Sequence, residues 1–236
     1  MSAAARLASG RHMTKQQYVY DTLRDAIIRC TLTPGERLII DDLARRLDIS
    51  IIPVREALRL LESEGLVSTI AHVGATVTPI SRQSVVEVFT VLEGLETVSA
   101  TAASRRASLA DYGPLDDLVV SMDDALAGGD QSAWAELNAA FHLAISRLAG
   151  MPMLDQMLRR ALDHWDRVRH YFFSGVLMRR ADVAQAEHHE LLRLMKDRDL
   201  EALERTMRAH NRGALAAYTA YLDSITPDAV AGGSRA

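Results

Sequence analysis

Apolar residues recur every three or four positions along most of the chain, the spacing that places side chains on one face of an α-helix. The pattern begins after Thr14, which forms a capping-box signature with Gln17 and so predicts the start of a helix. We expect this helix to end near Arg29. Its apolar face is formed by Val19, Leu23, Ala26 and Ile27. Residues 1–13 have no such period, so we expect a flexible arm or a remnant of cloning there.

Two shorter helices are predicted to follow. A Pro-Gly turn at 34–35 precedes them, and Asp41 and Asp42 indicate the start of the second helix. Ser50 can cap the third helix, and Gly65 supplies its end. The buried faces of the two helices are predicted to be formed by Leu43, Ala44, Leu47, Val54, Leu58 and Leu61.

After the third helix the apolar period drops to two, as in β-strands. Two short strands are predicted at 66–70 and 75–78, joined by a turn at 71–74. Three helices followed by a hairpin are typical of a winged helix-turn-helix, whose third helix enters the major groove of DNA and whose wing reaches an adjacent groove. We therefore expect a DNA-binding domain over residues 14–79.

The rest of the chain is helical by its apolar pattern. Six helices are predicted over 82–107, 111–127, 131–148, 152–173, 177–196 and 199–222. Stripes such as Leu137, Phe141 and Leu148 imply an antiparallel bundle over residues 80–223, with a flexible tail over 224–236. The predicted fold class is mostly α, an N-terminal winged helix-turn-helix followed by a C-terminal antiparallel α-helical bundle.

The composition agrees with a folded helical protein. Hydrophobic residues make up 48% of the 236 residues and charged residues 25%, as in average soluble proteins. Charges interrupt every apolar run before the roughly 20 residues that a membrane span needs, so no membrane partner is expected. Cys30 is the single cysteine and cannot form an internal disulfide, which together with the missing secretory signal predicts a cytoplasmic protein.

The net charge of −4 argues against a protein that coats nucleic acid without specificity. The charge is unevenly distributed. Residues 1–78 hold 10 basic and 9 acidic residues, whereas the remainder holds 17 basic and 22 acidic residues. This difference permits a nucleic-acid role at the N-terminal end.

Specific segments of the predicted DNA-binding domain resemble a known family. The stretches PGERLIIDDLARRLDIS and PVREALRLLESEGLV, with a wing around His72-Val73-Gly74, closely resemble the N-terminal domain of GntR-family transcription regulators. The resemblance implies that Ser50 and Arg55 contact DNA and that His72 and Gly74 approach the minor groove. Salt-dependent binding is expected through arginines such as Arg45, Arg46, Arg55 and Arg59.

One departure from the family pattern concerns DNA reading. Ile51 and Ile52 stand where the family usually has Arg-Thr, so an expected phosphate or base contact is missing. A bidentate arginine is worth roughly 1–3 kcal/mol of base discrimination, so its loss would change or weaken operator reading. The two isoleucines could touch thymine methyl groups, or they could pack into the domain or against a neighbour.

Candidate metal ligands lie on three of the bundle helices. Asn138 and His142 are four residues apart and share a helix face, and His188 and His210 lie on the fifth and sixth helices. These four donors could converge. A single histidine on a helix is more often a hydrogen-bonded core or surface residue, so spacing alone leaves both interpretations open.

A second resemblance favours the metal interpretation. The segments NAAFHLAI, AEHHELL and MRAHN resemble the metal-ligand segments of the FCD effector-binding domain of the FadR subgroup, and six helices suggest its VanR-like variant. The family's ligands map onto Asn138, His142, His188 and His210. Three histidines suit zinc or nickel, and water or an effector carboxylate would complete the shell. Asn138 replaces a commoner aspartate, which should weaken metal binding.

The first bundle helix also departs from the FCD pattern. In VEVFTVLEGLE, Leu92 stands where an arginine is usually available to an effector carboxylate. The pocket is therefore expected to be less basic than usual, and its effector less acidic or held differently. Arg169 and His170 could supply the missing charge and are candidate pocket residues.

Together these features predict a transcription regulator rather than an enzyme. We expect a homodimeric repressor of an inverted-repeat operator, controlled by a small organic acid bound at a divalent metal. Two alternatives remain at this point. One is a metabolite-binding module whose DNA reading is weakened by Ile51 and Ile52. The other is a metal-dependent hydrolase with Glu187 or Glu190 as its general base.

Overall fold

A computed structural model describes residues 13–70, 74–172 and 180–224 of the chain. These residues form two compact units, one up to Pro79 and one from Ile80, and each is described by itself. The arm expected over 1–13 and the tail expected over 224–236 lie outside the described residues, apart from Met13 and Ser224. The predicted wing residue His72 also lies outside them.

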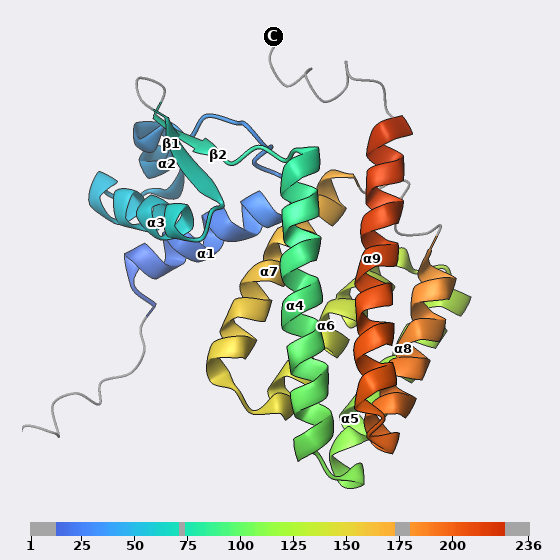
Figure 1. Cartoon of the computed structure of the whole chain (residues 1–236). Coiled ribbons are helices and arrows are strands. Elements are labelled where there is room, and N and C mark those ends of the chain that lie inside the picture. Colours follow the sequence, from blue (N-terminus) through green and yellow to red (C-terminus); the bar gives the residue numbers. More distant parts are fainter. Residues whose placement is uncertain (1–12, 71–73, 173–179, 225–236) are drawn as a thin grey trace, which may run out of the picture. The chain divides into compact units, whose positions relative to one another are not determined.

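The first unit contains three helices and a two-stranded antiparallel sheet (Figure 1). The elements are α1 (Lys15–Ile28), α2 (Ile40–Leu47), α3 (Ile51–Ser63), β1 (Val67–Ile70) and β2 (Gly74–Val77). The strands pair in register from Val67 opposite Val77 to Ile70 opposite Gly74. The predicted winged helix-turn-helix is confirmed.

The helix ends of this unit differ in detail from the sequence prediction. The Thr14 hydroxyl accepts a hydrogen bond from the Gln17 backbone N–H at 3.1 Å, but the Gln17 side chain donates to Asp21, so half of the capping box forms. Ser50 occupies the N-cap position of α3, where its side chain makes no capping hydrogen bond to described residues. Helix α2 begins after Ile39, so Asp41 and Asp42 lie within its first turn and not before it.

A single apolar cluster holds the first unit together. It is formed by Val19, Leu23, Ile27, Leu32, Leu38, Leu43, Ala44, Val54, Ala57, Leu58, Leu61, Leu66, Val67 and Val77. The segment before α2 joins the sheet edge, because Leu38 donates a backbone hydrogen bond to Ala75 and Val77 donates one to Glu36. Helices and hairpin therefore share one core.

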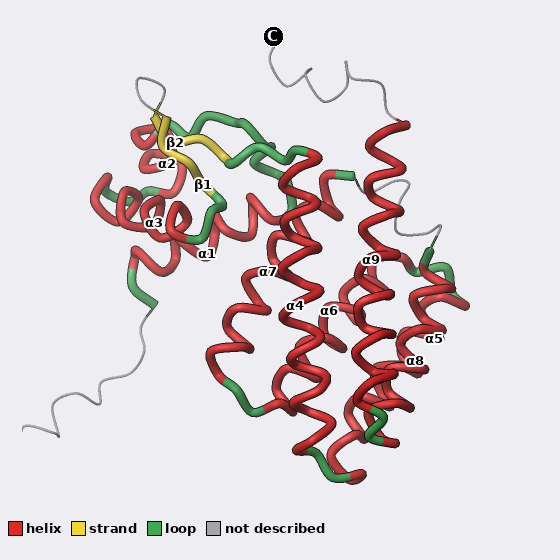
Figure 2. The backbone as a smooth tube through the Cα atoms, viewed as in Figure 1, coloured by secondary structure: helices red, strands yellow, loops and turns green. Residues whose placement is uncertain are grey.

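Within residues 80–172 and 180–224 the second unit forms a bundle of six α-helices, as predicted (Figure 2). Its helices are α4 (Arg82–Arg106), α5 (Gly113–Ala127), α6 (Gln131–Ala149), α7 (Pro152–Tyr171), α8 (Ala181–Asp197) and α9 (Leu200–Ser224). A 3₁₀ turn, Leu109–Tyr112, precedes α5, because Ser108 and Asp111 form a capping box there. Helix α4 contacts α6, α7, α8 and α9, which makes it the central helix of the bundle.

Local signals explain where several bundle helices begin and end. Ser81 and Ser84 form a reciprocal capping box at the start of α4. Pro152 opens α7, where its missing N–H leaves no helical hydrogen bond unmade. Gly150 ends α6 at φ +66°, and a Cβ there would lie 1.1 Å from an Arg106 nitrogen.

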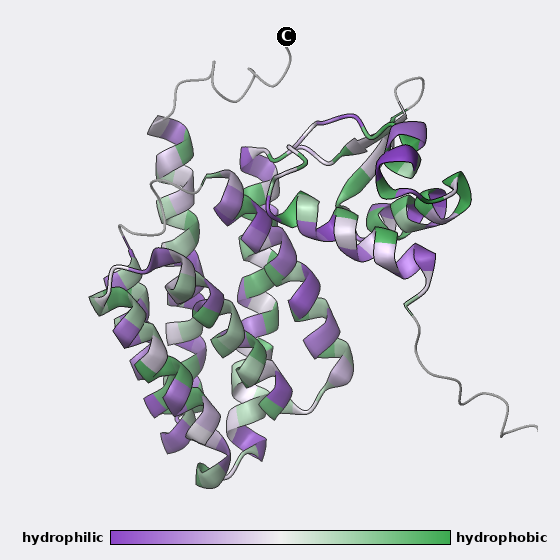
Figure 3. Ribbon diagram, turned by 180° about the vertical axis from the view of Figure 1, so that it is seen from behind, coloured by the Kyte–Doolittle hydropathy of each residue, from purple (hydrophilic) through white to green (hydrophobic). Residues whose placement is uncertain are grey.

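The bundle helices are amphipathic and enclose one continuous core. Figure 3 shows hydrophilic and hydrophobic residues interspersed along each helix rather than gathered on whole helices. The largest fully buried side chains of this core include Tyr112, Leu115, Met122, Phe141, Ile145, Leu158, Leu191, Met195 and Leu203. Among the described helices, none has both the length and the apolar character that crossing a membrane requires.

Candidate functional site

Three histidines from three bundle helices converge in the interior of the second unit. His142 comes from α6, His188 from α8 and His210 from α9, and all three are buried. Each offers a ring nitrogen within 4.8 Å of the other two. The ring centroids lie 4.9–5.5 Å apart. The structure therefore brings together the three histidines that the sequence singled out.

Asn138 lies one turn before His142 on α6 and is 7% exposed. It lines the same cavity as His142 and His210. A carboxamide oxygen can ligate a metal but carries no charge, unlike the aspartate that is commoner in the family pattern. The asparagine is thus placed beside the histidine cluster as a neutral donor.

Neighbouring side chains set the orientation of two of the rings. Nδ1 of His210 lies 2.7 Å from Oε2 of Glu187, and Nδ1 of His188 lies 3.3 Å from Oε1 of Gln185. A ring whose Nδ1–H donates to an oxygen presents the lone pair of Nε2 elsewhere. Such partners fix the tautomer that a metal ligand needs.

Two buried ring nitrogens support the metal interpretation. Nε2 of His188 has no hydrogen-bond partner among the described residues. Nδ1 of His142 lies 3.2 Å from Oε1 of Glu96 without being directed to make a hydrogen bond. Buried polar atoms are normally satisfied, so two unpaired nitrogens within one cluster of histidines fit a bound cation. Three nitrogen donors with an open position suit a tetrahedral divalent metal such as zinc.

The electrostatics of the cluster favour neutral rings at His142 and His188. Burial holds the pKa of His142 and His188 well below the usual range, and the nearby His210 lowers both further. Burial opposes ionisation of Glu187, but His210 and Arg180 outweigh it and lower the pKa of that carboxyl. Neutral imidazole is the form that binds metals, so His142 and His188 are ready to act as ligands at neutral pH.

A cavity adjoins the histidine cluster and encloses about 560 Å³ between protein atoms, part of it open to solvent. Its described lining residues are Phe89, Leu92, Glu96, Trp134, Asn138, His142, Leu162, Trp165, Arg180, Ala184, His210, Asn211, Ala214, Ala217 and Tyr218. Its walls are mostly apolar and aromatic, with a few polar groups, which is the usual character of a small-molecule site.

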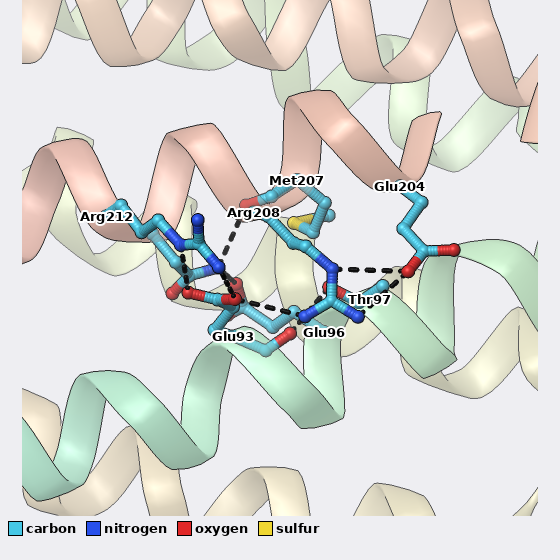
Figure 4. Close-up of polar contacts among 8 residues, drawn as sticks. Glu93, Glu96, Thr97, Glu204, Met207, Arg208 and Arg212 are labelled. Carbon is cyan, nitrogen blue, oxygen red and sulfur yellow. Dashed lines mark hydrogen bonds and ion pairs between the residues drawn. The ribbon is translucent and has the colours of Figure 1, made fainter. Parts of the chain in front are cut away.

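Glu96 contributes a buried carboxyl to the cavity wall. Burial raises the pKa of Glu96 to about 8, although the hydrogen bond from Asn211 opposes the shift. Next to it, on the same helix, Glu93 pairs with Arg208 and Arg212 of α9 (Figure 4). These contacts link α4 to α9 beside the cavity.

Of the three predicted effector-pocket residues, one lines the cavity and two do not. Leu92 lines the cavity, as the resemblance implied for its position. Arg169 and His170 are absent from the described lining. Arg169 pairs with Asp166 at 2.7 Å and lies over the Trp165 ring, and His170 bonds the Asp166 carbonyl. The lining arginine is instead Arg180, which directly precedes α8 and lies outside every segment that carries the family resemblance.

The predicted DNA-contacting residues of α3 face solvent. Ile51 is 40% exposed and Ile52 is 73% exposed. The interpretation that Ile52 packs into its own domain is therefore wrong, because most of its side chain remains accessible. Arg55 is exposed one turn further along α3. Ser50, at the N-cap, is also exposed.

The remaining predicted DNA contacts lie near acidic partners or in the hairpin. Arg45 pairs with Asp42 at 2.5 Å, and Arg59 pairs with Glu56 at 2.8 Å. Both arginine side chains are more than 70% exposed, so they remain accessible to a phosphate. Gly74 begins β2 at φ +96°, a conformation that favours glycine.

The two residues considered as a hydrolytic base are both engaged in ion pairs. Glu187 accepts two hydrogen bonds from Arg180 and contacts His210. Glu190 is exposed and pairs with Arg193 at 2.7 Å. Neither carboxylate is presented to the cavity as a free base.

Comparison with known proteins identifies both units. The model of the "Bacterial regulatory proteins, gntR family" matches residues 15–77, and that of the FCD domain matches residues 87–213. The HTH-type transcriptional regulator McbR of Escherichia coli is 27% identical over 191 residues, 81% of this chain and 86% of that protein. The HTH-type transcriptional repressor RspR of Escherichia coli is 25% identical over 194 residues, 82% of this chain and 84% of that protein.

A solved structure of E. coli McbR/YncC superposes with a TM-score of 0.72 at 26% identity, covering 89% of this chain and 99% of that one. The matched families and these relatives are transcription regulators, so the hydrolase alternative is not supported. The winged helix-turn-helix, the helical bundle and these matches all indicate the same family. This chain belongs to the GntR family of bacterial transcription regulators, in the group that carries an FCD domain.

Proposed function

We propose that this protein is a homodimeric repressor that binds an inverted-repeat operator and responds to a small organic acid held at a divalent metal. The convergence of His142, His188 and His210 beside a cavity carries the effector half of this proposal. The exposed start of α3 carries the DNA half. The relative named as a repressor supports the direction of control.

The proposed metal is zinc or nickel. Three imidazoles supply the ligands, Asn138 stands ready as a fourth donor, and an open position remains for water or an effector oxygen. When bound, the metal supplies a positive charge that attracts a carboxylate. The protein's own residues orient the rings, chiefly Glu187 at His210 and Gln185 at His188.

The proposed DNA contacts come from α3 and the hairpin. Arg55 reaches base edges or phosphates, and Ile52 offers apolar contact to thymine methyl groups, because both side chains are exposed at the start of α3. Arg45 and Arg59 contribute to phosphate binding after leaving their carboxylate partners. Gly74 and His72 are proposed to approach the minor groove.

A homodimer is proposed because an inverted-repeat operator requires two-fold symmetry in the protein. Helix α4 offers a surface for it. Val91 and Val98, 45% and 48% exposed, lie seven residues apart, and Gly94 between them leaves that stripe of the helix uncovered. Exposed apolar side chains at this spacing can pair with the same stripe of a second copy.

Helix α4 is the proposed link between effector and DNA. Phe89, Leu92 and Glu96 of this helix line the cavity, and its start follows β2 after residues 78–81. An effector that binds two dimer arrangements with different affinity shifts their populations, and a few kcal/mol of coupling is enough.

Operator selection tests the proposal. The full chain is used to enrich binding sequences from a pool of random DNA duplexes, with Arg55→Ala as the control protein. We expect enrichment of a short inverted repeat that the variant does not enrich. Failure of the full chain to enrich any sequence would favour the alternative in which DNA reading is weakened at Ile51 and Ile52. Zinc and nickel content of the same preparation, measured by elemental mass spectrometry, tests the metal separately.

A further inference from the structure

Arg180 is the arginine that reaches the effector cavity. It directly precedes α8, its side chain is 16% exposed, and it is the only Lys or Arg among the described lining residues. Leu92 of α4 occupies the position where the family resemblance implies an arginine. The cationic side chain of the cavity thus comes from the residue before α8 and not from α4.

Gly213 makes this position of Arg180 possible. A Cβ added to Gly213 would lie 2.2 Å from Nη2, 2.7 Å from Cζ and 2.8 Å from Nε of Arg180. The guanidinium therefore lies against the backbone of α9 at a point where any side chain would collide with it. Glycine inside a helix is destabilising relative to alanine, so its presence within α9 calls for a reason of this kind.

Glu187 holds the guanidinium while leaving part of it unused. Nη2 of Arg180 donates to both carboxylate oxygens, at 2.7 and 2.8 Å. Among the described residues, no hydrogen bond engages its Nη1 or Nε. A guanidinium has five N–H donors, so the Nη1 amino group of Arg180 can still donate to a second carboxylate.

The remaining lining indicates the class of molecule that would bind there. Phe89, Trp134, Leu162, Trp165 and Tyr218 contribute aromatic and aliphatic walls. A ligand with a carboxylate at one end and an apolar body would match both Arg180 and these walls. Among the described lining residues no second Lys or Arg accompanies Arg180, so the side chains of the cavity offer one cationic partner, which suits one carboxylate.

We propose that Arg180 is the effector-specificity residue, pairing with the carboxylate of an apolar monocarboxylic acid, and that Gly213 is glycine in order to admit its guanidinium. The proposal deepens the proposed function, on which it rests. Glu187 then joins Arg180 to the metal ligand His210, so that the carboxylate-binding cation and the metal are held by one shared side chain.

The test uses benzoate and hexanoate as probes, each compared with its neutral amide, on the full zinc-loaded protein by isothermal titration calorimetry. We expect both acids to bind at least about tenfold tighter than their amides. Arg180→Met should remove that preference while amide binding stays within about twofold. Arg193→Met is the matched control, because Arg193 is an exposed arginine of α8 paired with Glu190 and Asp197, and it should keep the preference.

Gly213→Ala tests the position of Arg180 separately from its charge. The variant keeps the arginine, but the new methyl group occupies the space in which its guanidinium lies. We expect this variant to lose the preference for acids as Arg180→Met does, with a cooperative thermal transition showing that it is folded. The double variant should lose no more than either single one. A folded Gly213→Ala protein with an unchanged preference would overturn the role given to Gly213.

Metal content distinguishes failure of this inference from failure of the proposed function. If Arg180→Met retains zinc and still prefers the acids, Arg180 is not the specificity residue. Equal binding of acids and amides by the unaltered protein also overturns the inference. If the unaltered protein holds no zinc but shows a preference that depends on Arg180, the metal is wrong and the inference stands.

Discussion

Asn211 and Glu96 are joined by a hydrogen bond inside the helical bundle: Nδ2 of Asn211 donates to Oε2 of Glu96 at 2.7 Å. Both side chains are 4% exposed. Asn211 follows His210 on α9, and the other oxygen of Glu96 lies 3.2 Å from Nδ1 of His142. This bond ties α4 to α9 beside the Glu93 ion pairs shown in Figure 4, and the contact of Glu96 with His142 reaches α6.

Replacing Asn211 with Ala should destabilise the protein by about 1–3 kcal/mol, because a buried carboxyl loses its hydrogen-bond donor. Glu96→Gln is the matched variant. It keeps an oxygen that can accept from Asn211, so we expect a loss below about 1 kcal/mol. Urea denaturation followed by circular dichroism measures both. Equal losses in the two variants would show that the hydrogen bond does not account for the effect.

Because of Glu93, the free energy of unfolding should fall as the pH is lowered. Arg212 donates two hydrogen bonds of 2.9 Å to this carboxylate, and these contacts, together with Arg208 and against the effect of burial, lower the pKa of Glu93 below its ordinary value of 4.5. A carboxyl with a lowered folded-state pKa stabilises the fold above pH 4.5, and this contribution is lost as the pH falls through the lower value.

The comparison of Glu93→Gln with the unaltered protein isolates this effect. At pH 6–7 the variant should melt a few degrees lower, and the difference in Tm should shrink as the pH is lowered below 4.5. Differential scanning calorimetry across this pH range measures it. A constant difference in Tm at every pH would mean that packing, not ionisation, explains the loss.

Replacing His142 with Ala should remove the bound metal, because two imidazoles and a neutral amide are a poor ligand set for zinc. His189→Ala is the control, since His189 is exposed and pairs with Asp123 instead of joining the cluster. Elemental mass spectrometry should find about one metal per chain in the control and almost none in His142→Ala. Asn138→Asp should bind the metal more tightly than the unaltered protein, because it restores a negative ligand.

Replacing Arg55 with Ala should weaken operator binding by about 10- to 100-fold, the loss that corresponds to roughly 1–3 kcal/mol of a good arginine contact. Arg29→Ala, at the far end of α1 and paired with Asp25, should change affinity less than about twofold. Fluorescence anisotropy at several salt concentrations measures both the affinity and the salt slope. An Arg55→Ala protein with undiminished affinity would remove α3 from the interface.

Replacing Val98 with Glu should dissociate the proposed dimer, because it places a charge in an apolar contact. Val120→Glu, at another exposed valine on α5, serves as the control and should leave the dimer intact. Sedimentation velocity distinguishes dimer from monomer. If both variants remain dimeric, the dimer forms through a surface other than the α4 stripe.

Much of the fold could be predicted because its signals are local. The helix start at Thr14 and the glycine at 65, which has φ +74°, act through backbone geometry within one turn. The three histidines could likewise be selected from their segments. Their positions on inward faces follow from the same apolar period that builds the core.

The charge of the cavity depended on contacts between helices that no local pattern encodes. Arg169 was a reasonable candidate on α7, but its side chain is held by Asp166 one turn earlier. Arg180 reaches the cavity because Gly213, on another helix, leaves room for its guanidinium. Residue spacing settles which side chains share a helix face. Which of those side chains meet across a bundle is decided by how the helices pack, because steric fit and ion pairing between distant residues arise only in the folded chain.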